Sequence, residues 1–239
     1  MLKRTVVISS PSKISISDRQ LVAESDVKRS LPLEDLGVLI LESLQTTITG
    51  VALSELANHN VAVITCDAAH LPSGLLLPLS AHSESTLRHR KQVDASQPLK
   101  KQLWKQCIQS KLGNQADRLQ LDGHPAAARK LRKWASEVKS GDSDNVEARA
   151  AQHYWRHFIP DPSFRRGAEG YFPNGLLNYG YAIVRATMAR AIVGTGLLPS
   201  LGLFHSNKYN AFCLADDLME PYRPFVDRVV SDLVRRGSE

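Results

Sequence analysis

Leu75–Ser85 reads LLLPLSAHSES, and the pattern of the sequence changes across this segment. Before it, short stretches that are rich in β-branched residues, or that alternate apolar and polar residues, are separated by polar turn clusters, as is typical of strands. After it, apolar residues recur at spacings of three and four, as is typical of helices. The sequence therefore predicts an α+β protein in which strands come first and helices follow.

Residues 1–79 are predicted to form a β-rich domain with one packed helix. Strands are expected at Thr5–Ile8, Lys13–Ser17, Gln20–Glu24, Leu36–Leu41, Val61–Thr65 and Leu75–Leu79, and the helix at Val51–His59. A small sheet domain with few charges on segments such as Leu36–Leu41 has limited means of covering its apolar surface alone. We therefore expect this domain to pair two copies of the chain in a homodimer.

Residues 80–87 are predicted to be a linker, and residues 88–239 an all-helical domain. Helices are expected at Leu99–Leu112, Ala126–Val138, Val146–Phe158, Leu176–Leu198, Asn210–Glu220 and Phe225–Val234. Loops rich in Pro and Gly, such as Ile159–Asn174, separate them.

The charge distribution favours phosphate binding by the later part of the chain. The 239 residues carry a net charge of +6, but residues 1–80 hold six Lys/Arg and eight Asp/Glu, so all of the basic excess follows them. Basic surfaces bind phosphates, although proteins that never touch nucleic acid also carry such charges. No Gly-rich phosphate loop or nucleophile elbow is present, which argues against nucleotide hydrolysis and serine-type acyl transfer.

Cysteine use and hydropathy bear on the compartment. Cys66, Cys107 and Cys213 lie far apart without C-x-x-C spacing, which predicts neither a disulfide framework nor a cysteine zinc site. No apolar run approaches the ~20 residues that cross a bilayer, and the first residues are too polar for a secretory signal. We expect a cytoplasmic protein without membrane contact.

An acidic cluster is the clearest candidate site. On a helix over Asn210–Glu220, about 100° per residue places Asp216, Asp217 and Glu220 on one face. Converging carboxylates repel one another unless a cation or a basic partner neutralises them, and a hard divalent ion with oxygen ligands is the natural candidate. A solvated helix end is the alternative interpretation.

Two residues elsewhere complete this candidate. His205 lies between apolar Leu201–Phe204 and polar residues, a setting that resembles the rim of a site. Glu147 is predicted in the first turn of a helix, with Asp144 or Asn145 near the cap and small residues on its face that allow another helix to approach. An acidic residue in a first turn also complements the helix dipole, so a structural role stays open.

Segments along the whole chain carry a family resemblance. They are Arg4–Ile8, Ser12–Ser15, Val61–Asp67, Leu71–Pro72, Leu76–Pro78, Glu147–Ala151, Asn178–Tyr181, His205–Asn210 and Asp217–Pro224. Their order and spacing resemble the CRISPR-associated spacer-acquisition integrases, the first-numbered Cas proteins, in the short form found beside type II effector nucleases. The resemblance implies an N-terminal β-sandwich, a helical catalytic domain and a homodimer formed largely through the β-domains.

The resemblance also implies the site and the reaction. Glu147, His205 and Glu220 would hold a divalent metal, Mg²⁺ or Mn²⁺, with Asp217 as an additional acidic residue beside them. Mixed nitrogen and oxygen ligation suits Mn²⁺ at least as well as Mg²⁺. The implied activity is that of a DNA endonuclease and integrase of CRISPR adaptation, in which a 3′-hydroxyl of a spacer precursor attacks a phosphodiester of the repeat. The implied partners are DNA and the small second-numbered Cas protein.

Basic residues are expected to surround this site and contact DNA. The residues that we expect there are Lys208, Arg223, Arg165 and Arg166. Two other functions remain open at this stage: a non-catalytic basic scaffold that binds nucleic acid without cutting it, and a metal hydrolase of small substrates.

Overall fold

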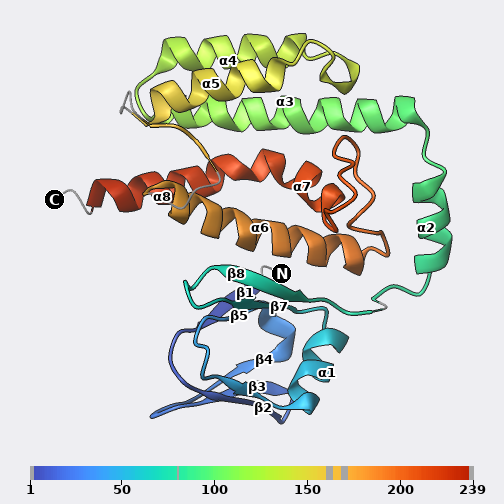
Figure 1. Ribbon diagram of the computed structural model, residues 1–239, viewed down its shortest axis with the longest axis vertical. Coiled ribbons are helices and arrows are strands. Elements are labelled where there is room, and N and C mark those ends of the chain that lie inside the picture. Colours follow the sequence, from blue (N-terminus) through green and yellow to red (C-terminus); the bar gives the residue numbers. More distant parts are fainter. Residues whose placement is uncertain (1–2, 80, 160–163, 168–171, 237–239) are drawn as a thin grey trace. The chain divides into compact units, whose positions relative to one another are not determined.

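The computed structural model describes residues 3–79, 81–159, 164–167 and 172–236, and it is α+β as predicted (Figure 1). The chain divides into two compact units. The first comprises Met1–Lys91 and Ala186–Leu198, and the second comprises Gln92–Arg185 and Pro199–Glu239. Among the described residues, no helix is both long enough and apolar enough to span a membrane.

Strands dominate the first unit. Within its described residues, one four-stranded sheet has the order β1 (Arg4–Ile8), β5 (Leu36–Leu41), β7 (Ala62–Cys66) and β8 (Pro72–Leu76). The other has the order β4 (Lys28–Pro32), β3 (Gln20–Glu24), β2 (Lys13–Ser17) and β6 (Thr47–Ile48). β5 runs parallel to both of its neighbours and is buried almost throughout, which is why its sequence is a continuous apolar run.

The two sheets share one core. Ile8 and Leu39 come from the first sheet, Ile14 and Leu21 from the second, and all four pack in one buried cluster with Leu56 of α1 (Gly50–Asn58). A single-turn 3₁₀ helix, η1 (Leu33–Asp35), leads into β5. This arrangement agrees with the predicted sandwich-like domain with one helix.

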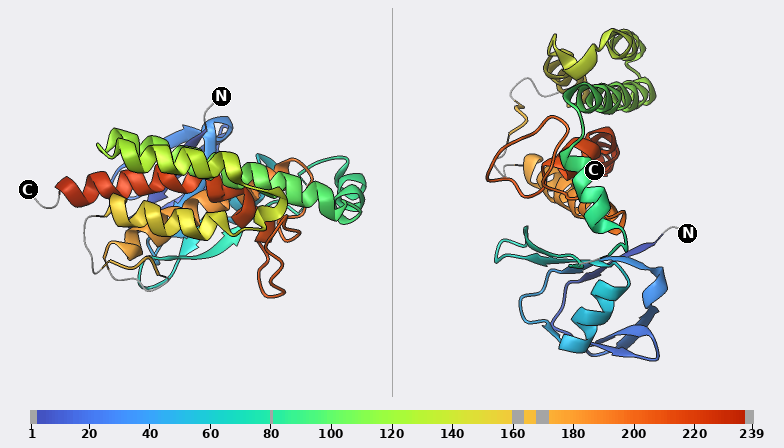
Figure 2. Two further views of the ribbon diagram at one scale, coloured as in Figure 1. Left: turned by 90° about the horizontal axis from the view of Figure 1, so that it is seen from above. Right: turned by 90° about the vertical axis from the view of Figure 1, so that its right-hand side faces the viewer.

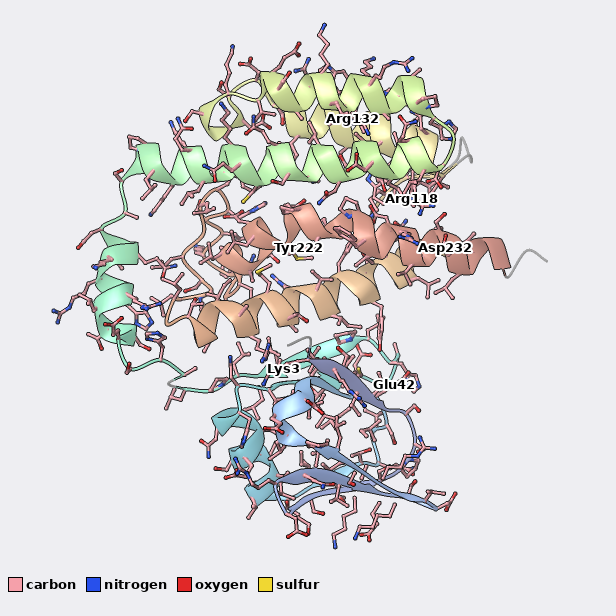
Figure 3. All side chains as sticks on the ribbon, turned by 180° about the vertical axis from the view of Figure 1, so that it is seen from behind. Lys3, Glu42, Arg118, Arg132, Tyr222 and Asp232 are labelled. Atoms are coloured by element: carbon pink, nitrogen blue, oxygen red, sulfur yellow. The ribbon has the colours of Figure 1, made fainter. Side chains whose placement is uncertain are left out.

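Helices make up the second unit. They are α3 (Gln97–Leu121), α4 (Pro125–Glu137), α5 (Val146–Phe158), the first part of α6 (Asn174–Gly194), α7 (Cys213–Met219) and α8 (Arg223–Arg236), with 3₁₀ turns η2 (Ser140–Asp142) and η3 (Glu220–Tyr222). α3, α4 and α5 run side by side (Figure 2) and bury Trp104, Leu112, Leu131 and Tyr154 between them. Arg118 of α3 lies 3.9 Å from Asp232 of α8, and both side chains are labelled in Figure 3.

The compact units differ from the predicted ranges 1–79, 80–87 and 88–239. A helix, α2 (Ser85–Val93), begins inside the predicted linker 80–87 and continues into the predicted helical domain, and the boundary between the two units lies after Lys91. α2 has no buried residue and therefore no apolar period that reveals a helix. Ala186–Leu198 belongs to the first unit, in which Arg190 Nε donates a hydrogen bond to the carbonyl of Asn60.

Candidate active site

One cavity of the helical unit is lined by all three predicted metal ligands and by two of the predicted DNA-contacting arginines. Its volume is about 410 Å³. The residues that line it are Lys111, Gln115, Glu147, Ala151, Trp155, Arg166, Gly167, Asn178, Tyr181, His205, Glu220, Arg223 and Asp227. Glu147, His205 and Glu220 thus face the same space although they are far apart in the sequence.

Glu147 reaches the cavity from the first turn of α5. The side chain that caps this helix is that of Asp142. Its two carboxylate oxygens accept hydrogen bonds from the backbone N–H groups of Val146 and Glu147, at 2.9 and 3.0 Å. Asn145 occupies the cap position without a side-chain bond, and Asp144 pairs instead with Lys139. The predicted cap position at Asn145 is therefore confirmed, but the side chain that accepts the capping bonds is Asp142, which reaches forward from η2.

Lys111 of α3 joins the two glutamates. Its Nζ lies 2.6 Å from Oε1 of Glu147 and 2.6 Å from Oε2 of Glu220, so these two oxygens are at most twice that distance apart. Burial acts to lower the pKa of Lys111, which is 7% exposed, but the two carboxylates outweigh burial and raise it. Lys111 is consequently an ammonium that stands between two of the predicted metal ligands.

Glu220 is more deeply placed than Glu147. It begins η3, is 5% exposed, and its Oε1 accepts a 2.7 Å hydrogen bond from Nε of Arg223. Burial pushes the pKa of Glu220 upward, but Lys111 and then Arg223 overcome this and lower it. Its Oε2 is buried and, apart from the ion pair with Lys111, receives no hydrogen bond.

His205 is oriented by Asp217. Nδ1 of His205 lies 2.5 Å from Oδ1 of Asp217, whose oxygens also accept the backbone N–H groups of Leu203, Phe204 and His205 at 2.6, 2.9 and 3.3 Å. The hydrogen bond to Asp217 raises the pKa of His205. With Nδ1 engaged, Nε2 is the ring nitrogen left for a ligand.

The loop that carries His205 fits closely around Asp217. A Cβ on Gly202 would lie 2.9 Å from Oδ2 of Asp217 and still closer to the carbonyl oxygen of His205, so a larger residue cannot occupy this position without moving the loop. The Phe204 ring stacks on Trp104 of α3 at 4.7 Å between centroids. The carboxylate and the ring contact together fix the imidazole at the cavity.

The three carboxylates of Asp216, Asp217 and Glu220 do not converge as predicted. α7 begins at Cys213 rather than Asn210, and each acid has partners of its own. Oδ1 of Asp216 pairs with Nε of Arg185 at 2.7 Å. Asp217 and Glu220 have the different partners described above. Among the described residues, no three His, Cys, Asp or Glu side chains are grouped so that they could hold a metal ion.

The cavity is nevertheless lined by donor atoms of the kinds that a divalent cation binds. Glu147, Glu220 and His205 supply carboxylate oxygens and one imidazole nitrogen, a set that Mn²⁺ and Mg²⁺ accept. Oε2 of Glu220 is a buried oxygen that faces the ammonium of Lys111 at 2.6 Å. The position between the carboxylates is the one that Lys111 holds.

The predicted DNA-contacting residues divide into two pairs. Arg166 and Arg223 line the cavity, and their guanidinium carbons lie 5.2 and 4.5 Å from the centre of the Tyr181 ring. Arg165 and Lys208 are exposed and are not part of the lining. Arg166 is held by Asn174 and Asn178 through bonds of 3.0 and 2.7 Å.

Sequence reasoning missed Lys111 and Asp227, although a signal for both exists. Lys111 lies on the same stripe of α3 as buried Trp104, Ile108 and Leu119, where a lysine is unusual. Asp227 takes a buried position on α8, one turn before Val230. A charged residue at a core position of an amphipathic helix indicates a buried partner or a site.

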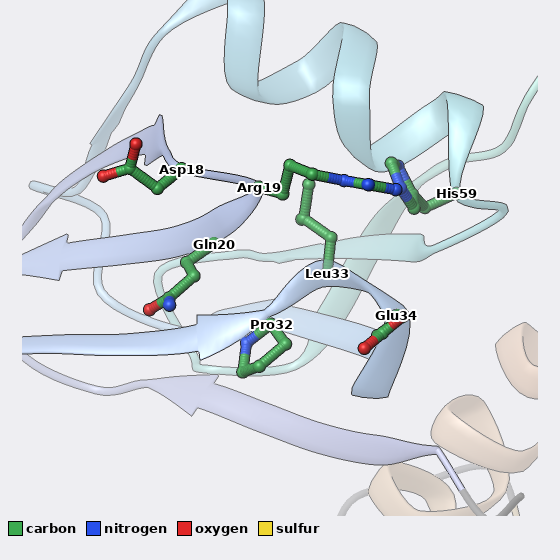
Figure 4. A pocket seen from close by; sticks show the side chains of 7 residues that line it. All are labelled: Asp18, Arg19, Gln20, Pro32, Leu33, Glu34 and His59. Atoms are coloured by element: carbon green, nitrogen blue, oxygen red, sulfur yellow. The ribbon is translucent and has the colours of Figure 1, made fainter.

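The first unit has a smaller cavity. Its volume is about 200 Å³, and Asp18, Arg19, Gln20, Pro32, Leu33, Glu34 and His59 line it (Figure 4). The side chain of Arg19 extends past Leu33 toward His59 (Figure 4). None of the sequence-predicted site residues lies there.

Comparisons with known proteins agree with this architecture. The chain matches the family of CRISPR associated protein Cas1 over residues 5–238. It is 40% identical to the CRISPR-associated endonuclease Cas1 of Neisseria meningitidis serogroup C (strain 8013), over 99% of this chain and 78% of that protein. The chain thus belongs to the Cas1 family of CRISPR-associated proteins, which confirms the resemblance seen in the sequence.

Solved structures share the fold at low sequence identity. A CAS1 protein from Thermotoga maritima has a TM-score of 0.76 at 17% identity, over 99% of this chain and 80% of that one. A casposase bound to an integration product has a TM-score of 0.74 at 22% identity, over 100% and 74%. A chain of a Cas6-RT-Cas1–Cas2 complex has a TM-score of 0.75 at 20% identity, over 99% of this chain and 28% of that one.

Proposed function

We propose that this protein is a divalent-metal-dependent DNA endonuclease and integrase of CRISPR adaptation, which acts in the cytoplasm. The observation that carries the proposal is the cavity in which Glu147, His205 and Glu220 meet basic residues. Family membership, the endonuclease name of the Neisseria relative and the integration product of the casposase support it.

Glu147, His205 and Glu220 would hold the metal, which when bound polarises the phosphodiester and stabilises the charge that develops on its oxygens. Other residues of the chain orient the proposed ligands and neutralise the charge of the substrate. Asp217 fixes the imidazole of His205 through Nδ1. Arg166 and Arg223 bring positive charge to the cavity lining, where a phosphate requires it.

The proposed reaction joins a DNA 3′ end to the repeat. The 3′-hydroxyl of a spacer precursor gives up its proton to solvent while its oxygen forms a bond to the phosphorus of a repeat phosphodiester. The opposite P–O bond breaks, and the leaving 3′-oxygen takes up a proton from solvent. Cleavage is the same displacement with water as the nucleophile. We extend the proposal to the small second-numbered Cas protein as a partner, supported by the Cas1–Cas2 complex that shares this fold.

Pairing of two copies through residues 1–79 is part of the proposal. The small sheet unit exposes Val7, Val27, Leu44 and Leu71, apolar side chains that a second copy would cover. Sedimentation of the purified protein at micromolar concentration is expected to show a dimer. A strictly monomeric species would contradict this part.

The decisive experiment compares the wild type with His205→Ala on a branched DNA with Mn²⁺. We expect the wild type to cleave this DNA, and to join a 3′ end into a repeat-containing duplex, only with Mn²⁺ or Mg²⁺. His205→Ala should lose both activities by about 100-fold or more, since it removes a ligand. Glu147→Ala and Glu220→Ala should lose both activities in the same way. All three variants should still bind DNA.

The matched control is His124→Ala, which removes an exposed histidine of the same unit that does not line the cavity. Equal turnover by folded wild type and His205→Ala would place the chemistry elsewhere, and metal-independent turnover would overturn the mechanism. Tight, salt-dependent DNA binding without any cutting would favour the alternative function, a non-catalytic basic scaffold.

A further inference from the structure

The charges around the cavity are balanced before any metal ion is added. The lining contains three cationic side chains, Lys111, Arg166 and Arg223, and three acidic ones, Glu147, Glu220 and Asp227. A divalent ion adds two positive charges to a partly enclosed space, in which charges are screened less than in water. Such an ion binds favourably there only if a cation moves away or an anion enters with it.

Lys111 is the cation placed to respond. Its Nζ lies 2.6 Å from an oxygen of Glu147 and 2.6 Å from an oxygen of Glu220. Two cations cannot occupy that position together. Arg223, by contrast, contacts Glu220 from the other oxygen and lies over the Tyr181 ring, so that it does not block the space between the glutamates.

On the basis of the proposed function, we propose that Lys111 is a resident counter-ion which a divalent ion displaces toward a DNA phosphate, so that metal and DNA bind cooperatively. The lysine stem has four rotatable carbon–carbon bonds, so the ammonium can shift while α3 stays in place. Once displaced, the ammonium is repelled by the ion and attracted by the phosphate. The phosphate thereby supplies the negative charge that the cavity lacks.

The same residue stabilises the protein before metal arrives. Without Lys111, the carboxylates of Glu147 and Glu220 would face each other with Arg223 as their remaining close cation. That arrangement is more acidic and should hold a metal ion tightly even without DNA. Lys111 thus weakens metal binding in the free protein and makes it depend on the substrate.

The test is the affinity for Mn²⁺, measured by electron paramagnetic resonance of the free ion and corrected for Mn²⁺ bound by DNA alone. The probe is a branched DNA whose junction phosphodiester is replaced by a methylene phosphonate, which cannot be cleaved there but keeps its negative charge. We expect this DNA to raise the Mn²⁺ affinity of the wild type by about tenfold or more, within the usual range of coupling between sites. An uncharged methylphosphonate at the junction should give less than a third of that gain.

Lys111→Met should bind Mn²⁺ without DNA about tenfold more tightly than the wild type and gain less than about threefold from the charged DNA. Lys101→Met, which removes an exposed lysine of the same helix, should behave as the wild type does. If Lys111→Met fails to fold, the wild type with charged and uncharged junctions still tests the predicted coupling, and its absence overturns the proposal.

The possible failures are distinguishable. Equal Mn²⁺ affinity of the wild type with and without the charged DNA, in a protein that integrates DNA, overturns the role of Lys111 and leaves the proposed function standing. No Mn²⁺ binding in any state overturns the metal mechanism together with this inference.

Discussion

Asp217 and Glu220 are buried carboxylates three residues apart, yet the protein neutralises them in opposite ways. Asp217 is 0% exposed and is surrounded by three backbone N–H groups and the imidazole of His205. Glu220 is held by the side-chain cations of Lys111 and Arg223. Backbone donors are fixed by the fold, whereas side-chain cations can exchange for another ion. Asp217 therefore suits orientation, and Glu220 suits coordination.

Removal of Asp217 should have the largest effect on stability. Asp217→Ala leaves three backbone N–H groups and Nδ1 of His205 without an acceptor, so we expect the free energy of unfolding to fall by about 3 kcal/mol or more. Urea denaturation of the metal-free protein measures this loss. Asp216→Ala is the control, since the Arg185 partner of Asp216 is partly exposed, and it should cost about 1 kcal/mol or less. Equal losses would show that the backbone hydrogen bonds to Asp217 add no more stability than the ion pair of Asp216.

Among the described residues, a third carboxylate, Asp227, accepts no hydrogen bond from a backbone N–H group and forms no ion pair with a cation. It is 1% exposed and accepts a hydrogen bond from the Tyr181 hydroxyl. Burial raises the pKa of Asp227 to about 6, against the opposing effect of that hydrogen bond. Between about pH 4 and pH 6 the folded protein holds a proton that the unfolded chain has released, so this group makes stability fall as pH rises through that window.

Asp227→Asn should remove this contribution while Oδ1 can still accept from Tyr181. We expect the variant to gain about 2 kcal/mol relative to the wild type at pH 8, and little at pH 4, in urea denaturation at both values. A variant that is destabilised equally at both pH values would mean that Asp227 is ionised and paired in the folded protein. The pKa of Glu220 is lowered, so its own contribution has the opposite sign and is lost as pH falls.

The smallest difference in the free energy of unfolding is expected between variants of Glu220 and Glu147, the two glutamates that share Lys111. Glu220→Gln removes the charge that balances both Lys111 and Arg223 in a buried setting, and we expect a loss of about 1–2 kcal/mol. Glu147→Gln should cost about half of that or less, because the Glu147 side chain is 27% exposed and solvent replaces part of the interaction. Thermal unfolding in the absence of divalent ions compares them. A larger loss for Glu147→Gln would mean that Lys111 is held chiefly from α5.

The sequence predicts the fold well where apolar periodicity is strong. β5 and α5 were expected at the bounds that the structure gives them, because β5 is a continuous apolar run and the buried positions of α5 recur at helical spacing. β4 and α2 escaped detection, since Lys28–Pro32 exposes most of its side chains and Ser85–Val93 buries none. Strands and helices with mostly exposed side chains depend on contacts with neighbouring elements, and a local sequence pattern does not reveal such contacts.

The sequence predicted which acidic and histidine residues line the site, but not which cations pair with them. Spacing and family resemblance singled out Glu147, His205 and Glu220, and the structure places all three at one cavity. Which cation balances which acid depends on contacts between residues far apart in the chain. Lys111 is 36 residues before Glu147 and still meets it, which no helical spacing reveals.

The way the loop before α7 wraps Asp217 has a consequence for hydrogen exchange. The amides of Leu203, Phe204 and His205 share one buried acceptor, so a single opening must release them together. Loop amides ordinarily exchange fast and independently with solvent. These three are expected to exchange slowly and at a common rate, as the amides of one helical turn do, although the segment is not helical. The imidazole of His205 is thus carried by a loop that opens and closes as one cooperative unit.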